Sequence, residues 1–170
     1  MMGFANRMMV AMAAAVSVAG MAHAQTATSA ADYVAKAGAS DQYEIQSSKL
    51  VLQSSKDQKI RGFANKMIAD HTKSTAMVTA AAKKAGMNPS PPMLDADGQQ
   101  MISQLQGVSG KERDAMYTTQ QTASHAKALT LTQDYAQNGD SAPLKAAAAK
   151  IVPVIEHHQQ MLQNMSHVGM

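Results

Sequence analysis

The sequence predicts an all-α protein, an antiparallel four-helix bundle with a long crossover between helices two and three. Two observations lead to this prediction. Apolar residues recur at three- and four-residue spacing through four long segments, which is the period of an amphipathic helix. Glycine, proline and asparagine-glycine signals separate these segments, and none of them alternates apolar and polar residues as a strand would.

The first 24 residues have the three parts of a cleavable signal peptide. Arg7 supplies a positive charge, the run from Met8 to Ala19 is apolar, and Ala22-His23-Ala24 offers small residues for cleavage. The apolar run is shorter than the ~20 residues that span a bilayer. We therefore expect cleavage near Ala24 and a periplasmic or secreted protein without a transmembrane segment. Its mature part would consist of a polar tail over residues 25–30 and a bundle domain over residues 31–167.

The composition of the remaining chain narrows the function. One of the 15 basic residues, Arg7, lies in the leader, so 14 basic side chains face 12 acidic ones, a net charge of +2. That balance, without any basic run, argues against a nucleic-acid partner. The absence of cysteine excludes disulfides, thiolate metal sites and cysteine nucleophiles. About 145 residues remain, which is enough for one hydrophobic core.

The first predicted hairpin comprises two long helices. One runs from Ala31 to about Gln53, and a short break with a capping serine or aspartate follows it. The second carries an apolar stripe from Ile60 to Ala81 and ends at Gly86, because glycine adopts the left-handed conformation of a helix end without strain. Since the break is short, we expect the two helices to pack antiparallel.

A long crossover leads to the second predicted hairpin. The three prolines within residues 87–98 prevent a continuous helix and favour an extended path, and a short helix follows over about residues 99–105. Long helices are expected over about residues 111–137 and 141–165, with a turn at Asn138-Gly139-Asp140 between them. Two hairpins joined by one long connection make a ferritin-like bundle.

Each long helix carries one side chain of a metal-ligand type on its inward face: Glu44, His71, His125 and His158. At about 1.5 Å of rise per residue, His125 and His158 differ in height by roughly 6 Å, and Glu44 and His71 by roughly 7–8 Å. Side chains of this length can close offsets of about one turn, but the same estimate allows two separate layers. The four residues are therefore a candidate site whose closure the sequence leaves open.

Three imidazoles and one carboxylate form a donor set for zinc, copper, iron or nickel. The chain lacks the Glu-x-x-His pattern of di-iron bundles, so no ferroxidase site is expected. One alternative is a structural network in which the buried groups hydrogen-bond one another, and another is a proton or redox role without metal. A copper(I) site at His157, Met161 and Met165 is a further alternative. The polar neighbours that would support the ligands are Asp70, Tyr117, Gln121, Glu156 and His157.

Several short motifs carry a family resemblance over about residues 31–165. The most specific are Phe63-Ala64-x-x-Met67-Ile68-x-Asp70-His71-Thr72 and the spacing from Val152-Pro153 to His158. The others are Asp32–Ala37, Glu44 before Ser48-Lys49-Leu50, and Tyr117 eight residues before His125. The chain resembles bacterial proteins that are labelled predicted outer membrane proteins, the family of the domain of unknown function 4142, which is placed among ferritin-like folds.

This resemblance implies a ferritin-like bundle in the cell envelope, with Glu44, His71, His125 and His158 at the family's polar positions. It implies no activity, since the family is largely uncharacterised. The segment Arg113–Tyr117 departs from the Phe-Asp-x-x-Tyr start that is usual there. Two hypotheses follow: a periplasmic metal-binding or redox protein, and a non-catalytic envelope or stress-related protein with a structural polar network. No catalytic triad, phosphate loop or cofactor fingerprint supports an enzyme, and the sequence names no protein partner.

Overall fold

The structure is a computed structural model, and it describes residues 28–166. Within that range the chain forms five α-helices and no strand, which confirms the all-helical prediction. In chain order the helices are α1 (Ala30–Leu52), α2 (Gln58–Lys84), α3 (Ala96–Gln106), α4 (Gly110–Asn138) and α5 (Ala142–Ser166). The predicted signal peptide and its cleavage site lie outside the described residues. No helix of the described range is long and apolar enough to cross a membrane.

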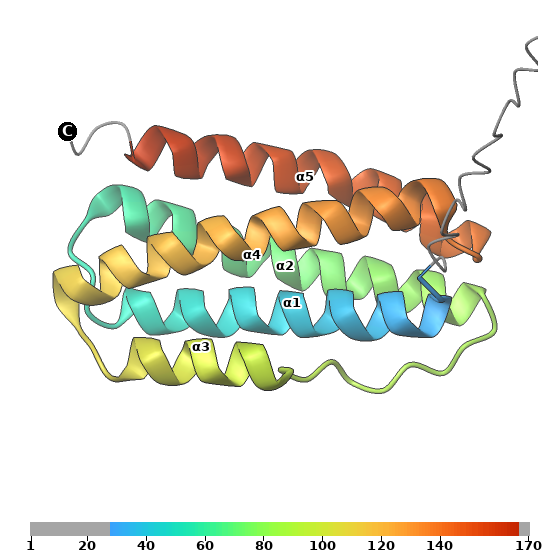
Figure 1. Ribbon diagram of the computed structural model, residues 1–170, viewed down its shortest axis with the longest axis horizontal. Helices are drawn as coiled ribbons and strands as arrows, with labels where there is room; N and C mark the ends of the chain where they lie inside the picture. Colours follow the sequence, from blue (N-terminus) through green and yellow to red (C-terminus); the bar gives the residue numbers. More distant parts are fainter. Residues whose placement is uncertain (1–27, 167–170) are drawn as a thin grey trace, which may run out of the picture.

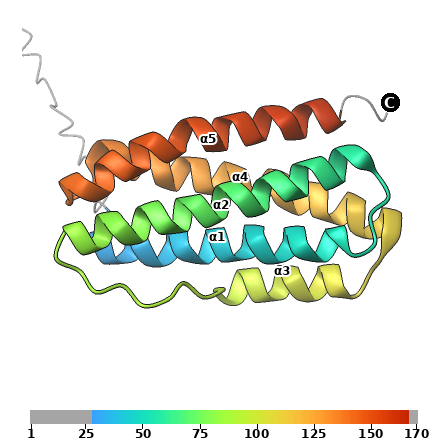
Figure 2. The same ribbon diagram turned by 180° about the vertical axis from the view of Figure 1, so that it is seen from behind.

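The four long helices form two antiparallel hairpins, α1 with α2 and α4 with α5 (Figure 1). The hairpins pack against each other through α2 with α5 and α1 with α4. The crossover after α2 and the short α3 return along the outside of the bundle, where α3 lies against α1 (Figure 2). The prediction of a helical bundle is therefore confirmed, while the ferritin-like assignment stays a prediction.

The ends of α2 show why the chain breaks where it does. The Asp57 carboxylate accepts hydrogen bonds from two backbone N–H groups of the first turn and thereby caps the helix. At the other end Gly86 has a φ of 79°, and the amides of Gly86 and Met87 donate to carbonyls of the last turn. The crossover then packs closely on α1 at Gly38. A Cβ atom at this position would lie only 2.8 Å from the Pro92 Cβ, so the close approach requires glycine.

The core consists of two apolar clusters with a polar layer between them. One cluster contains Tyr33, Val78, Ala82, Tyr135, Leu144, Ala148, Ile151 and Ile155. The other contains Val51, Phe63, Ala64, Met67, Leu105, Tyr117 and Leu162. On each long helix, buried polar residues separate the members of the two clusters; these are Asp41, Glu44, His71, Gln121, His125 and His158. The fold thus places all four predicted ligands in the middle of the bundle.

Candidate metal centre

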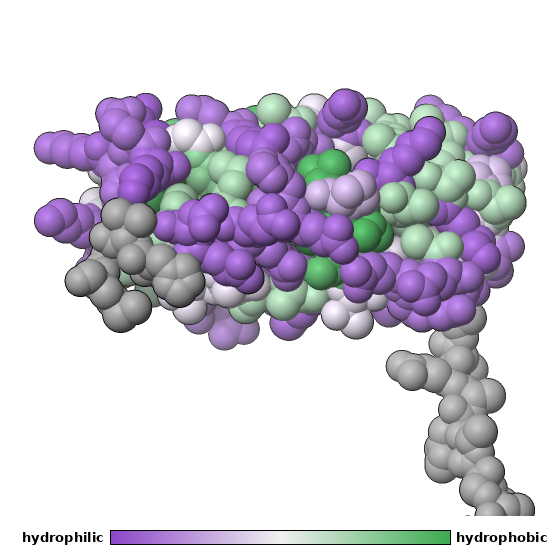
Figure 3. All heavy atoms as spheres, turned by 90° about the horizontal axis from the view of Figure 1, so that it is seen from above, coloured by the Kyte–Doolittle hydropathy of each residue, from purple (hydrophilic) through white to green (hydrophobic). Residues whose placement is uncertain are grey.

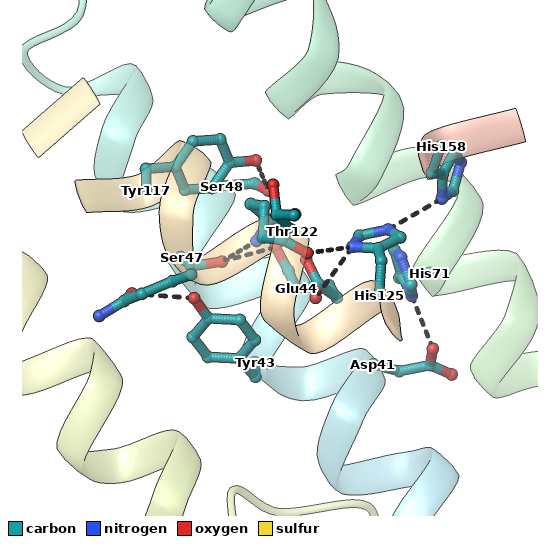
Figure 4. Close-up of polar contacts among 12 residues, drawn as sticks. Asp41, Tyr43, Glu44, Ser47, Ser48, His71, Tyr117, Thr122, His125 and His158 are labelled. Atoms are coloured by element: carbon teal, nitrogen blue, oxygen red, sulfur yellow. Dashed lines mark hydrogen bonds and ion pairs between the residues drawn. The ribbon is translucent and has the colours of Figure 1, made fainter. Parts of the chain in front are cut away.

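Three of the four predicted ligands meet in the polar layer. His71 of α2, His125 of α4 and His158 of α5 each offer one ring nitrogen, and these three atoms lie within 4.8 Å of one another. The ring centroids are between 5.3 and 5.7 Å apart. All three side chains are buried (Figure 4). The face of the bundle on the side of α5 carries hydrophilic side chains with apolar ones among them (Figure 3).

Asp41 of α1 fixes the orientation of His71. His71 Nδ1 lies 2.8 Å from Asp41 Oδ1, and the Thr75 hydroxyl donates to the other carboxylate oxygen at 2.9 Å. Because a carboxylate only accepts hydrogen bonds, Nδ1 carries the proton and donates it. The second ring nitrogen, Nε2, is buried and has no hydrogen-bond partner in the described part of the chain. His71 therefore keeps one nitrogen free.

His125 and His158 are oriented in the same way by different acceptors. His125 Nδ1 donates to the backbone carbonyl of Gln121 at 2.9 Å, and His158 Nε2 donates to Asp70 Oδ2 at 2.8 Å. Lys66 Nζ lies 2.9 Å from the same Asp70 oxygen. Each ring thus donates from one nitrogen and keeps the other as an acceptor.

The free nitrogens of these two rings face each other. His125 Nε2 lies 3.2 Å from His158 Nδ1, and both are acceptors because the opposite nitrogen of each ring donates elsewhere. Two buried acceptors at hydrogen-bond distance leave each other unsatisfied. A positive charge beside the two nitrogens, either a proton or a metal ion, would satisfy both acceptors.

Protons are distributed unevenly over the three rings. Burial is the main cause that lowers the pKa of His125 to about 3 and that of His158 to about 4, and the charge of His71 contributes to both shifts. Burial also opposes the charged form of His71. The hydrogen bond to Asp41 and the charge of Glu44 outweigh this effect and raise the pKa of His71. Of the three rings, His71 is therefore the first to take up a proton as the pH falls.

Glu44, the fourth predicted ligand, lies beside the outer edge of His125. Its Oε1 is 3.7 Å from His125 Nδ1, the nitrogen that donates to Gln121. Its other oxygen is buried and has no hydrogen-bond partner among residues 28–166. Burial raises the pKa of this carboxyl to about 7. Glu44 is thus close to the cluster but does not join the group of three nitrogens.

The structure brings only some of the predicted supporting residues to the histidines. Asp70 and the carbonyl of Gln121 accept hydrogen bonds from the rings. The Tyr117 hydroxyl pairs at 2.7 Å with a serine hydroxyl of α1 instead. Glu156 and His157 are exposed on α5, so the structure does not bring them to the cluster.

Sequence reasoning missed Asp41, the acceptor that orients His71. A signal for it was present, because Asp41 precedes Glu44 by three residues and therefore lies on the same face of α1. Thr75, which supports Asp41, likewise follows His71 by four residues on one face of α2. Helical spacing therefore predicts both residues as neighbours of the candidate ligands.

The arrangement has the features of a metal centre built on imidazole. Each ring keeps one nitrogen free and gives its other N–H to a carboxylate or carbonyl, the pattern that orients metal-bound histidines. The centre of a triangle with sides of at most 4.8 Å lies at most about 2.8 Å from each corner, and a metal–imidazole bond measures ~2.0–2.1 Å. Inward movements of under ~1 Å would therefore suffice to bind one ion.

Fold and site together define a class, an all-helical bundle with a buried three-histidine cluster at mid-height. The chain belongs to the family of the domain of unknown function DUF4142, whose profile matches residues 15–165, and this confirms the family resemblance. It is also similar to a solved structure from Streptomyces coelicolor, described as a candidate secreted protein DUF305, with a TM-score of 0.67. That likeness has 17% identity, covers 82% of this chain and 91% of the other, and shows the fold alone. No curated protein matches this chain.

Proposed function

We propose that this is an exported protein that binds one divalent transition-metal ion through His71, His125 and His158. The 3.2 Å contact between His125 Nε2 and His158 Nδ1 carries the proposal. A purely structural network would pair each buried acceptor with a donor, as nearly all buried polar groups in proteins are paired. A single cation satisfies both of these acceptors and the free Nε2 of His71 as well.

The donor set and the nearby charges suit zinc, copper, iron or nickel. Imidazole is a common ligand for all four metals, and neutral rings leave the two positive charges of the ion intact. Asp41 and Asp70 accept hydrogen bonds from His71 and His158. Their negative charges therefore lie next to the ligand rings and offset the charge of the ion. Glu44 adds a third acidic group, and we assign it a positioning role through the N–H edge of His125.

The proposed export rests on two observations. Residues 1–24 read as a leader with a cleavage site, and the similar Streptomyces protein is described as a candidate secreted protein. We propose the periplasm as the location. The intact mass of the protein from a periplasmic extract should correspond to a chain that begins at Gln25 or within a residue or two of it. A main species that retains Met1 would contradict export.

Metal analysis of His158→Ala beside His157→Ala tests the metal site. The two histidines are adjacent in α5, but His158 belongs to the cluster and His157 is exposed, so the second variant is a matched control. We expect about one metal ion per chain in the wild type and in His157→Ala, and none in His158→Ala. A chelator should lower the melting temperature of the first two proteins only, because an ion at a hundred times its Kd adds about 2.7 kcal/mol to stability.

The structural alternative forecasts a different outcome for the same experiment. If the cluster only joins helices, His158→Ala still destabilises the protein by about 1–3 kcal/mol, because the buried His125 loses its hydrogen-bond partner. The wild type would then contain no metal. Its melting curve would not respond to chelator or to added zinc, copper, iron or nickel, and that result would refute the metal site.

A further inference from the structure

A small cavity lies beside the histidine cluster. Residues of all four long helices line it, and they include His71, His158 and Tyr33. Its volume is about 30 Å³, whereas one water molecule needs ~10–15 Å³. The cavity therefore has room for a guest of two or three atoms next to two of the three proposed ligands.

Tyr33 brings an unused hydrogen-bond donor to this cavity. Its side chain is fully buried, yet its hydroxyl has no well-formed hydrogen bond in the described part of the chain. Burial raises the pKa of this hydroxyl, a hydrogen-bonding interaction with the Thr132 side chain that falls short of good geometry lowers it, and the charge of Asp41 raises it further. Tyr33 and both of these residues line the cavity. A buried donor without a well-formed hydrogen bond is unfavourable and points to a guest that accepts a hydrogen bond from it.

Three histidines leave a position open on a bound metal ion. Zinc and similar ions usually have four ligands, and no fourth protein donor joins the nitrogens within the described residues. Glu44 stands at the outer edge of His125, beside the nitrogen that donates to Gln121. A site with three protein ligands and one open position is typical of centres that bind small molecules, whereas structural sites are closed.

We infer that this cavity receives an exogenous fourth ligand of the metal ion, to which the Tyr33 hydroxyl donates a hydrogen bond. The ligand is a small oxygen or nitrogen donor of at most three heavy atoms, such as water, hydroxide or a linear anion. The size limit follows from the cavity volume and from the apolar side chains of Leu131, Ile151 and Ile155 in its wall. The inference rests on the proposed metal site and extends it from binding of an ion to binding of a small molecule.

Titration of the Co²⁺-loaded mature chain with azide tests the inference. Co²⁺ gives visible absorption bands that depend on its ligands, so azide at the fourth position should change them. Tyr33→Phe removes one oxygen atom and keeps the ring that stacks on Tyr135 with centroids 4.0 Å apart. We expect this variant to bind azide about five- to tenfold more weakly and Co²⁺ with unchanged affinity, because a single hydrogen bond is lost.

Tyr135→Phe is the matched control, since the Tyr135 hydroxyl donates to Asp140 at 2.9 Å and neither residue lines the cavity. It should bind azide like the wild type. A Co²⁺ spectrum that ignores azide would overturn the fourth-ligand position while the metal site stands. Equal azide affinities of the two variants would overturn the role of Tyr33. Failure of the wild type to bind Co²⁺ would contradict the metal site itself and this inference with it.

Discussion

The two hairpins contribute to the histidine cluster in different ways. In the α1–α2 hairpin, His71 donates to Asp41, and this pair is complete without any added ion. In the α4–α5 hairpin, an acceptor nitrogen of His125 faces an acceptor nitrogen of His158. These two nitrogens are satisfied only when a positive charge lies beside them. Structural and functional polar groups thus share one layer of the core. The direction of the hydrogen bonds, not burial, distinguishes them.

The pH dependence of metal affinity should give the largest effect of this difference. Despite its burial, His71 has a raised pKa because of Asp41 and Glu44, whereas burial lowers the pKa of His125 to about 3 and that of His158 to about 4. Metal ligands must be deprotonated, so a single proton competes with the ion between about pH 4 and the raised pKa of His71. Zinc affinity should therefore fall about tenfold for each unit by which the pH drops, and about a hundredfold over two units.

Calorimetric titration with zinc at several pH values measures this slope, with the protonation heat of the buffer subtracted. Above the pKa of His71 the affinity should level off, because all three rings are then neutral. Because Glu44 beside His125 has a pKa of about 7, a slope of two protons would add Glu44 to His71, whereas a slope of three protons would mean that the hairpins titrate alike. The comparison between them would then fail, although the metal site would remain.

The fold was predictable because it depends on patterns along the chain. Apolar spacing gave the long helices, and Gly86 and the prolines of residues 87–98 gave the end of α2 and the crossover. The same spacing placed His71, His125 and His158 on inward faces, where the structure has them. These features need only the period of a helix and the conformational limits of glycine and proline.

The partner of His71 shows what the sequence left undetermined. Glu44 lies about five residues from the level of His71 when both are counted from the turn, which is roughly 7–8 Å, and Asp41 lies about two residues from it, or roughly 3 Å. The structure pairs His71 with Asp41, the nearer one. The residue count from the turn therefore favours the pairing of His71 with Asp41. Residue spacing could not predict the tautomers, the cavity or the Tyr33 hydroxyl without a well-formed hydrogen bond. These features depend on side-chain rotamers and on atoms from four helices at once.

Stability of the metal-free protein is the smaller but more direct test of the comparison. Asp41→Ala leaves His71 Nδ1 and the Thr75 hydroxyl without their buried acceptor, so it should destabilise the protein by about 1–3 kcal/mol. His125→Gln instead brings an N–H donor toward His158 Nδ1 and removes the clash of acceptors. We expect its free energy of unfolding to stay within about 0.5 kcal/mol of the wild type or to rise, although metal binding is lost.

Urea unfolding of both variants and the wild type, each treated with chelator, gives the three free energies under one condition. The expected order distinguishes the Asp41–His71 pair, which is satisfied without an ion, from the His125–His158 pair, which needs a cation. Only loss of the first pair should lower the free energy of unfolding of the metal-free protein. If His125→Gln loses as much stability as Asp41→Ala, then the contact between His125 and His158 is a sound hydrogen bond in the metal-free protein. In that case a proton lies between the two rings, and the observation that carries the metal site would have a structural explanation.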